Sequence, residues 1–546
     1  MRKTGWILLL GSLPWITSCG GGGSTDKTNP PPPPPAQSSS YTVTAWSELG
    51  MHCMDGKDYS VFAILPPYNT LHAQVLKHGD PPALATDVTV TYEAVADAAG
   101  SINTSSAGKT NFWTYVQALF GASPAPEIGL AGTPTQSKTP HPMTYNAKAG
   151  AWDAVGIPTV PYDDAGARNP YPMAKVVVKD ASGTVLASTT AVLAVSDELT
   201  CSTCHASGSN ALAQPAAGWE NDPDPSKDTK LNILKKHDDR WDISPHLAAL
   251  KAGGYNYQAS LYQTAKSGTP VLCAACHATN ALGAPGVSGV KALTADMHTL
   301  HGPIANPATG VPLDHAATPS GSCYLCHPGL QTKCQRGAMH NVACFDCHGN
   351  LTTVGATQRQ GWIDLPSCQM CHESGARHAT TFDSGGAWRV STDSTFATNP
   401  DKPAAGKSLY KVSTGHGGLY CAACHGSQHG EYPTTQANDN LYSTGLQGYT
   451  GKIVECLVCH NTMPSTTAGG PHGMHTIGQN WVHDHRSGAK NGTAACAYCH
   501  GADFRGTPLS AIATTRTLSV DDGSKTFSAG HQMNCYDCHN GPHGGD

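Results

Sequence analysis

The pentapeptide Cys201-Ser202-Thr203-Cys204-His205 decides the fold, because it is the first of nine C-x-x-C-H repeats in this chain. The other eight begin at Cys273, Cys323, Cys344, Cys368, Cys421, Cys456, Cys496 and Cys535. The chain's own cysteine and histidine frequencies give about 0.04 chance matches over its length. Chance therefore does not explain the repeat, which is a signature of c-type haem attachment.

The spacing follows from the chemistry of attachment. Two thiols separated by two residues can each add to one vinyl group of a porphyrin, and the next histidine is then held beneath the iron as its proximal ligand. The predicted attachment cysteines are Cys201, Cys204, Cys273, Cys276, Cys323, Cys326, Cys344, Cys347, Cys368, Cys371, Cys421, Cys424, Cys456, Cys459, Cys496, Cys499, Cys535 and Cys538. The predicted proximal ligands are His205, His277, His327, His348, His372, His425, His460, His500 and His539. The sequence thus predicts nine covalent haem c groups.

Two other uses of paired cysteines are weaker interpretations. Zinc ribbons share one tetrahedral metal between two C-x-x-C units, but zinc does not require a histidine after every second cysteine. Thioredoxin-like sites need one C-x-x-C on a βαβ unit, whereas these motifs lie in stretches rich in glycine and proline.

The second axial ligand of each iron is expected to be another histidine. Fifteen histidines outside the motifs lie between residues 198 and 546, more than nine irons need. Bis-histidine ligation leaves no site for a substrate and favours electron transfer. The candidate distal ligands are His237, His298, His301, His416, His429, His472, His475 and His485, together with His52 from the N-terminal part.

Some of these histidines come in pairs. His298 and His301, and likewise His472 and His475, are three residues apart, so one short element could serve two haems if each segment is helical. Surface histidine pairs or adventitious metal binding are the alternative. His315, His340, His378, His483, His531 and His543 are evenly balanced between ligand and non-ligand, and His246 is expected to be structural. No C-x-x-C-K variant marks one haem as a catalytic centre.

Haem number also sets the architecture. Residues 198–546 provide about 39 residues for each of nine haems, too few for separate helical shells. The chain has 59 glycines and 39 prolines, and only 13% of its residues are charged, so long loops are expected. We expect a nonahaem cytochrome c domain that is packed around its haems, has short helices and little regular secondary structure, and does not fold without haem.

Residues 41–197 carry no C-x-x-C-H motif and are expected to form a mostly-β, sandwich-like domain. Five predicted strands are rich in Val, Thr, Tyr and Ile: 41–46, 59–65, 87–92, 174–179 and 185–195. Asp180-Ala-Ser-Gly183 is predicted to be a hairpin turn, and residues 111–120 a helix. The function of this domain stays open between docking, shielding and capping of the haem chain, and His52 is either a haem ligand or a buried structural residue.

Residues 1–19 are expected to be a lipoprotein-type signal peptide that directs export. Arg2 and Lys3 precede a short apolar run, and Ile16-Thr17-Ser18-Cys19-Gly20 resembles the lipobox of bacterial lipoproteins, with Cys19 as the lipidated residue. The alternative is plain cleavage with Cys19 discarded. Residues 20–40 are rich in glycine and proline and are predicted to form a linker. No acidic residue follows Cys19 directly, which by resemblance to lipoprotein sorting implies the outer membrane rather than the inner one.

Two cysteines remain, Cys53 and Cys334. Exported cysteines tend to be paired, and two remaining cysteines are the number needed for one disulfide, which would join the two domains. An intermolecular bridge or a thiolate ligand is the alternative.

The chain resembles the large extracytoplasmic multihaem cytochromes of metal-respiring bacteria, including the outer-surface and nanowire types. The resemblance lies in residues 323–339, 410–429 and 470–475 and in the phrase Glu48-Leu-Gly-Met-His52-Cys53-Met-Asp55. It covers most of residues 45–546, specifically at the motifs and loosely between them. It implies bis-histidine haems that carry respiratory electrons to metal oxides or partner cytochromes, with homopolymers as a further option.

Electron transfer rather than enzymatic activity is therefore the expected function. The alternative is a multihaem reductase with one open-site haem acting on a nitrogen or sulfur oxyanion, and a third option is periplasmic electron storage. A net charge of −6 without a basic run argues against nucleic acid as a partner.

Overall fold

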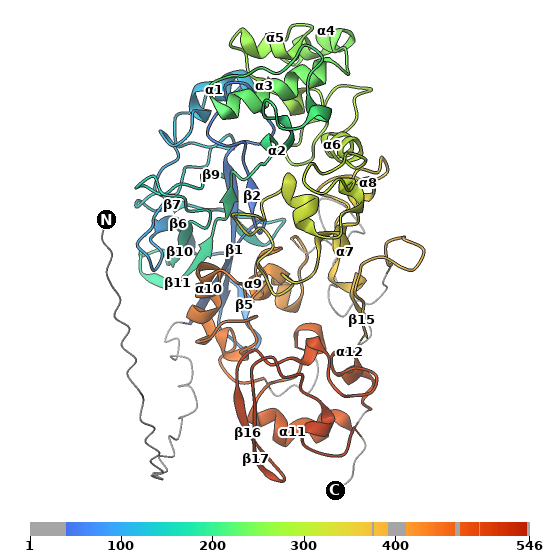
Figure 1. Cartoon of the computed structure of the whole chain (residues 1–546). Helices are drawn as coiled ribbons and strands as arrows, with labels where there is room; N and C mark the ends of the chain where they lie inside the picture. The colour runs from blue at the N-terminus through green and yellow to red at the C-terminus, as the bar shows by residue number, and fades with distance from the viewer. Residues whose placement is uncertain (1–39, 374–375, 391–410, 465–469, 491, 543–546) are drawn as a thin grey trace, which may run out of the picture.

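The computed structural model describes residues 40–373, 376–390, 411–464, 470–490 and 492–542. The predicted signal peptide with Cys19, nearly all of the linker and His543 lie outside the described residues. The described chain has an N-terminal region of antiparallel sheets followed by a region of short helices and little regular structure (Figure 1). We call residues 41–197 the β-rich region and residues 198–546 the C-terminal region.

Two antiparallel sheets form the β-rich region. The first has the order β1-β4-β9-β8, with β5 also paired to β4, and the second has the order β11-β10-β6-β7. Their strands are β1 Tyr41–Ser47, β4 Tyr68–Lys77, β5 Ala83–Leu84, β6 Thr89–Val95, β7 His141–Pro142, β8 Thr144–Asn146, β9 Ala151–Pro158, β10 Met173–Lys179 and β11 Val185–Val192. Leu71 and Ile157 of the first sheet and Val176 of the second are fully buried in one shared core. The two sheets therefore bury their apolar faces against each other.

The predicted strand at 59–65 is largely wrong, because only β3, Phe62–Ala63, forms there. The buried carboxylate of Asp55 accepts the amide protons of Ile64 and Leu65. A side chain thus takes the donors that a longer strand ladder would have used. The other four predicted strands form within a few residues of their expected bounds, the helix α1 is Phe112–Phe120, and Gly183 donates to Asp180 in the predicted hairpin turn.

Two short parallel strand pairs lie near the boundary of the two regions. Strand β2, His52–Cys53, pairs with β12, Val195–Ser196, and β3 pairs with β13, Val271–Leu272. The pair of β3 with β13 joins one region to the other. Figure 1 shows the C-terminal region running along the β-rich region, from α3, α4 and α5 at one end to α11, β16 and β17 at the other.

The remaining elements are short. The helices of the C-terminal region are α2 Ser202–His205, α3 Pro225–Asp238, α4 Leu247–Ala252, α5 Leu261–Lys266, α6 Leu293–His301, α7 Cys344–His348, α8 Leu351–Val354, α9 Cys421–His425, α10 Ala437–Gln447, α11 Gln479–Ala489 and α12 Ala497–His500. Its hairpins are β14 His372–Glu373 with β15 Ala376–Arg377, and β16 Arg516–Val520 with β17 Gly523–Phe527. In the described part of the chain, no helix is long and apolar enough to cross a membrane.

Candidate haem-binding cavity

Each C-x-x-C-H motif folds as a single helical turn. The amide of His205 donates to the carbonyl of Cys201 at 2.9 Å, and the amide of His327 donates to that of Cys323 at 2.8 Å. One turn places residues three and four apart on the same face. The two thiols and the histidine of a motif therefore point the same way, as attachment to one planar group requires.

Seven motif histidines face a second histidine ring at nearly constant distance. Two imidazoles on opposite sides of one metal ion, each with a metal–nitrogen distance of about 2 Å, place their ring centroids about 6 Å apart. The observed pairs are His205–His301 (6.4 Å), His327–His298 (6.1 Å), His348–His429 (6.1 Å), His460–His416 (6.0 Å), His425–His472 (5.9 Å), His500–His475 (6.2 Å) and His539–His485 (5.7 Å). Each pair leaves room for one metal ion between its rings.

The hydrogen bonds of these rings leave the second nitrogen for a metal. The Nδ1 atoms of His298 and His301 lie 2.7 Å from the carbonyl oxygens four residues earlier on α6. The Nδ1 of His500 lies 2.7 Å from the carbonyl of Met533. A carbonyl can only accept, so Nδ1 carries the proton and Nε2 keeps its lone pair. This is the tautomer that a metal-ligating histidine needs.

Single short elements serve two motifs, as the three-residue spacing predicts. His298 and His301 lie on α6 and face the motifs at Cys323 and Cys201. His472 and His475 face the motifs at Cys421 and Cys496, but from a tight turn at Pro471–Gly473 rather than a helix.

Backbone strain marks two of the facing histidines. His429 and His472 both have φ near +60°, a left-handed conformation that non-glycine residues adopt rarely. Such conformations cost of order 1 kcal/mol and concentrate at functional sites. The surrounding structure, rather than the backbone preference of these residues, must therefore hold their rings in place.

The two remaining motifs also have histidine neighbours. Burial is the main cause that lowers the pKa of His237, at the end of α3. Asp238 opposes this effect, and the nearby His277 adds to it. His372 has a pKa lowered to about 4, first by burial and then by Arg377, Lys452 and His378. The structure thus brings candidate ligands near every motif.

Burial keeps these imidazoles neutral. It lowers the pKa of His348 to about 3, with His429 as the next cause, and the pKa of His425 to about 3, with Lys452 as the next cause. Neutral imidazole is the form that binds metal. Burial also raises the pKa of the Cys368 and Cys424 thiols to about 12.

One cavity of about 2270 Å³ connects most of the motifs. Ordinary ligand pockets measure about 300–1,000 Å³, and close-packed interiors leave few voids larger than a water molecule. Its lining includes both cysteines of the motifs at Cys323, Cys344, Cys368, Cys421, Cys496 and Cys535, and Cys201 of the first motif. The other two motifs adjoin it, since Ala278 directly after His277 lines it, as does His416, the partner of His460.

This geometry fits a planar group held between two opposed histidines better than a tetrahedral metal. Zinc in a structural site takes four converging ligands. Among the described residues, no three or more His, Cys, Asp and Glu side chains converge as a metal site. The histidines instead occur as opposed pairs beside a cavity lined by cysteines.

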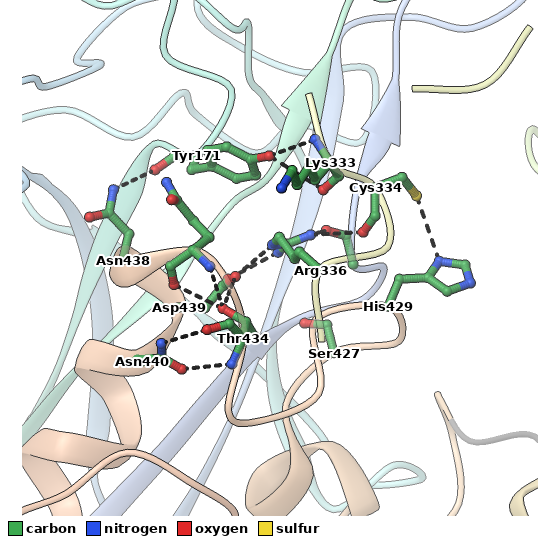
Figure 2. Close-up of polar contacts among 12 residues, drawn as sticks. Tyr171, Lys333, Cys334, Arg336, Ser427, His429, Thr434, Asn438, Asp439 and Asn440 are labelled. Carbon is green, nitrogen blue, oxygen red and sulfur yellow. Dashed lines mark hydrogen bonds and ion pairs between the residues drawn. The ribbon is translucent and has the colours of Figure 1, made fainter. Parts of the chain in front are cut away.

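Cys53 and Cys334 are unbonded thiols that lie close enough to affect each other. Burial raises the pKa of Cys53 beyond its usual range, and Cys334 is the next cause. Figure 2 shows the sulfur of Cys334 turned toward His429, with Sγ and Nδ1 3.7 Å apart. Both cysteines line the cavity. A disulfide between them stays a prediction.

The other histidines occupy varied settings. His52 is buried in β2 and packs against Tyr68 with ring centroids 4.5 Å apart, and its neighbours Met51 and Cys53 line the cavity. His531 contacts Asp537 at 2.9 Å, His340 contacts the carbonyl of Gly337, and His483 contacts Gln479. His246 ends a short 3₁₀ turn, Ser244–His246. The role of His52 as a distal ligand stays a prediction.

Residues that the sequence analysis did not single out also contact the paired histidines. The Trp481 ring stacks on His475 at 3.7 Å and 6°. Asp80 of the β-rich region lies beside His460. Trp481 is six residues from His475, but Asp80 is 380 residues from His460, so no local spacing could reveal it. Comparison with protein-family models, curated proteins and solved structures finds no match to this chain.

Proposed function

We propose that this protein is an electron-transfer protein that binds nine c-type haems covalently, with two histidines as axial ligands of each iron. The observation that carries the proposal is the set of seven opposed histidine pairs, 5.7–6.4 Å apart, arranged along one cavity with the motif cysteines. When bound, haem iron supplies one-electron oxidation and reduction. The motif cysteines would hold the groups, and the paired histidines would fill both axial positions.

The continuity of the cavity supports transfer along the chain rather than at one centre. Histidines of neighbouring sites lie close enough for one to add to the effect of burial in lowering the pKa of another. His327 and His298 of the preceding pair contribute to the lowered pKa of His348. His372 contributes in the same way to the lowered pKa of His425. Towards the C-terminus, His485 contributes to the lowered pKa of His475. Successive sites are therefore neighbours in space as well as in sequence.

The biological setting belongs to the same proposal. We propose export, with attachment to the outer membrane through Cys19 or display at the cell surface. The electrons would pass to extracellular acceptors such as metal oxides, to partner cytochromes, or to other copies of the chain. The β-rich region would be a sandwich-like domain packed on a nonahaem cytochrome domain.

The test begins with the mass and colour of the exported protein. We expect the mass of nine haems above that of the polypeptide, low-spin spectra for all of them, and rapid oxidation of the reduced protein by a soluble ferric chelate.

His301→Ala is expected to make one haem in nine high-spin and able to bind carbon monoxide when reduced. His246→Ala is the matched control and is expected to leave all nine low-spin. A colourless protein, or zinc in place of iron, would contradict the proposal. High-spin haem in the wild type would favour the reductase.

A further inference from the structure

The loop between β4 and β5 of the β-rich region lies against the seventh motif, Cys456–His460. Gly79 forms a parallel bridge with His460. The hydroxyl of Thr42 on β1 donates to the carbonyl of Val458 inside the motif, and it also contacts Nε2 of His78 at 2.8 Å. The motif is therefore held by the β-rich region at several points.

One contact reaches the metal-ligating side chain itself. Oδ1 of Asp80 lies 3.4 Å from Nδ1 of His460. Oδ2 of the same carboxylate accepts from the Thr462 hydroxyl at 2.8 Å, so Thr462 holds the carboxylate in place. The His460 ring also neighbours the ring of His416, with 6.0 Å between ring centroids. His460 thus neighbours both a carboxylate and the proposed iron position.

This arrangement differs from that of the other motif histidines with described Nδ1 contacts. His277 and His500 direct Nδ1 to backbone carbonyls, of Lys291 at 2.9 Å and of Met533 at 2.7 Å. A carboxylate oxygen of Asp296 also lies near Nδ1 of His277, but farther away, at 3.8 Å, and it belongs to the C-terminal region itself. A carboxylate carries a full negative charge, whereas a carbonyl carries only a partial one. A negative charge beside Nδ1 makes the imidazole a stronger donor to the metal and favours the more positive iron.

We infer that Asp80 is a positioning residue for His460 that lowers the reduction potential of the haem at Cys456 and Cys459, so that the β-rich region tunes one site of the haem chain. The inference rests on the proposed haem binding. It gives the β-rich region a function, since the carboxylate comes from a different part of the chain than the motif.

The test uses the full-length, haem-loaded protein and the variant Asp80→Asn. We expect one haem in nine to become easier to reduce, with about a tenfold change in its one-electron equilibrium constant, equivalent to about 59 mV. A potentiometric titration followed by visible absorption would measure the shift. The low-spin electron paramagnetic resonance signal of the same single haem is expected to change its g values. Asp80→Glu is expected to restore part of both effects.

Two further variants separate positioning from general damage. Thr462→Val leaves the carboxylate present but releases its anchor, so a smaller shift of the same haem in the same direction is expected. Asp180→Asn changes a carboxylate in the Asp180–Gly183 hairpin turn and is expected to leave the titration unchanged.

Haem content by mass distinguishes the possible failures. Nine haems in Asp80→Asn with a titration and resonance spectrum identical to the wild type would overturn the inference and leave the proposed function standing. A wild-type protein without haem would overturn both. If Asp80→Asn loses the haem at Cys456, the Thr462→Val titration decides, and an unshifted curve there would overturn the inference.

Discussion

The β-rich region and the C-terminal region fill their interiors in different ways. In the β-rich region, Leu71, Tyr92 and Val176 from both sheets are fully buried against one another. The described part of the C-terminal region instead surrounds a cavity of about 2270 Å³ lined by cysteines, histidines and apolar side chains. The β-rich region is closed by its own side chains, whereas the C-terminal region has local apolar clusters, such as that of Leu231 and Leu234, beside a cavity large enough for the proposed haems.

The difference shows why regular secondary structure is scarce in only one of the two regions. A sheet buries its apolar face only against another layer of side chains, so it needs long strands with the right register. If the proposed haems form the core of the C-terminal region, that region needs only short turns that present ligands to them. The nine motif turns and elements such as α6 meet that need.

The largest expected effect comes from withholding haem. When the chain is exported without haem attachment, we expect residues 198–546 to lose protection against hydrogen exchange almost completely, because an unfilled cavity of this size cannot stay closed. Strands β4 and β10 of the β-rich region are expected to keep measurable protection, because their core consists of their own side chains. Hydrogen exchange followed by mass spectrometry would compare the two regions in one sample. Equal protection in both regions would break the comparison.

A smaller effect is expected at a buried ion pair of the C-terminal region whose arginine also contacts the β-rich region. Arg336 is 1% exposed and makes a two-point contact with Asp439 of α10, at 2.5 and 2.9 Å (Figure 2). The same guanidinium donates to the carbonyl of Gly50 in the β-rich region and lies over the Tyr171 ring. The substitution Asp439→Asn leaves a buried cation without its counter-charge, so a loss of about 3–5 kcal/mol in the free energy of unfolding is expected.

Urea unfolding of the haem-loaded protein, followed by circular dichroism, would measure that loss. The matched control is Lys266→Gln, which removes the more exposed partner of the Lys266–Glu220 pair and is expected to cost under about 1 kcal/mol. Equal costs for the two variants would mean that the buried Arg336–Asp439 pair contributes no more to stability than an exposed pair.

The sequence predicted those parts of the site that depend on short spacing. C-x-x-C-H fixes one helical turn, and the three-residue spacing of His298 and His301 placed both on one helix facing two motifs. Such features are local, because bond geometry and helical periodicity determine them within five residues. Which motif each histidine faces depends on long-range packing and could not be predicted.

The sheets show the same limit. Strand β4 was not predicted, because Asn69 and Gln74 interrupt its apolar pattern. Both side chains are fully buried, and they donate to the carbonyls of Ala194 and Gly418, far along the chain. A polar residue with a distant partner looks like a surface residue when only its neighbours in sequence are known. The contact between Asp80 and His460 escaped prediction for the same reason.

The smallest expected effect concerns a buried carboxyl at the boundary of the two regions. Asp55 belongs to the β-rich region and lines the cavity, and among the described residues its Oδ1 has no hydrogen-bond partner. Burial raises the pKa of Asp55 from 3.8 to about 6, against the opposing effects of Lys230 and of the Ile64 and Leu65 amides. The folded protein therefore holds this proton more tightly than the unfolded chain does.

The sign of the pH dependence follows. The stabilisation from the protonated carboxyl is fully present below the unfolded pKa near 4 and is lost as the pH rises through about 6. We expect the unfolding free energy of the wild type to fall relative to that of Asp55→Asn over this window, by at most about 3 kcal/mol, and to stay level above it. Urea unfolding of both proteins at a series of pH values would measure the difference.

Asp180→Asn is the control, because the Ser182 hydroxyl and nearby amides lower the pKa of that exposed carboxyl, so no change is expected between about pH 5 and 7. A wild type that gains stability over Asp55→Asn as the pH rises would mean that Lys230 compensates the charge, and that the boundary of the cavity is an ion pair rather than a protonated acid.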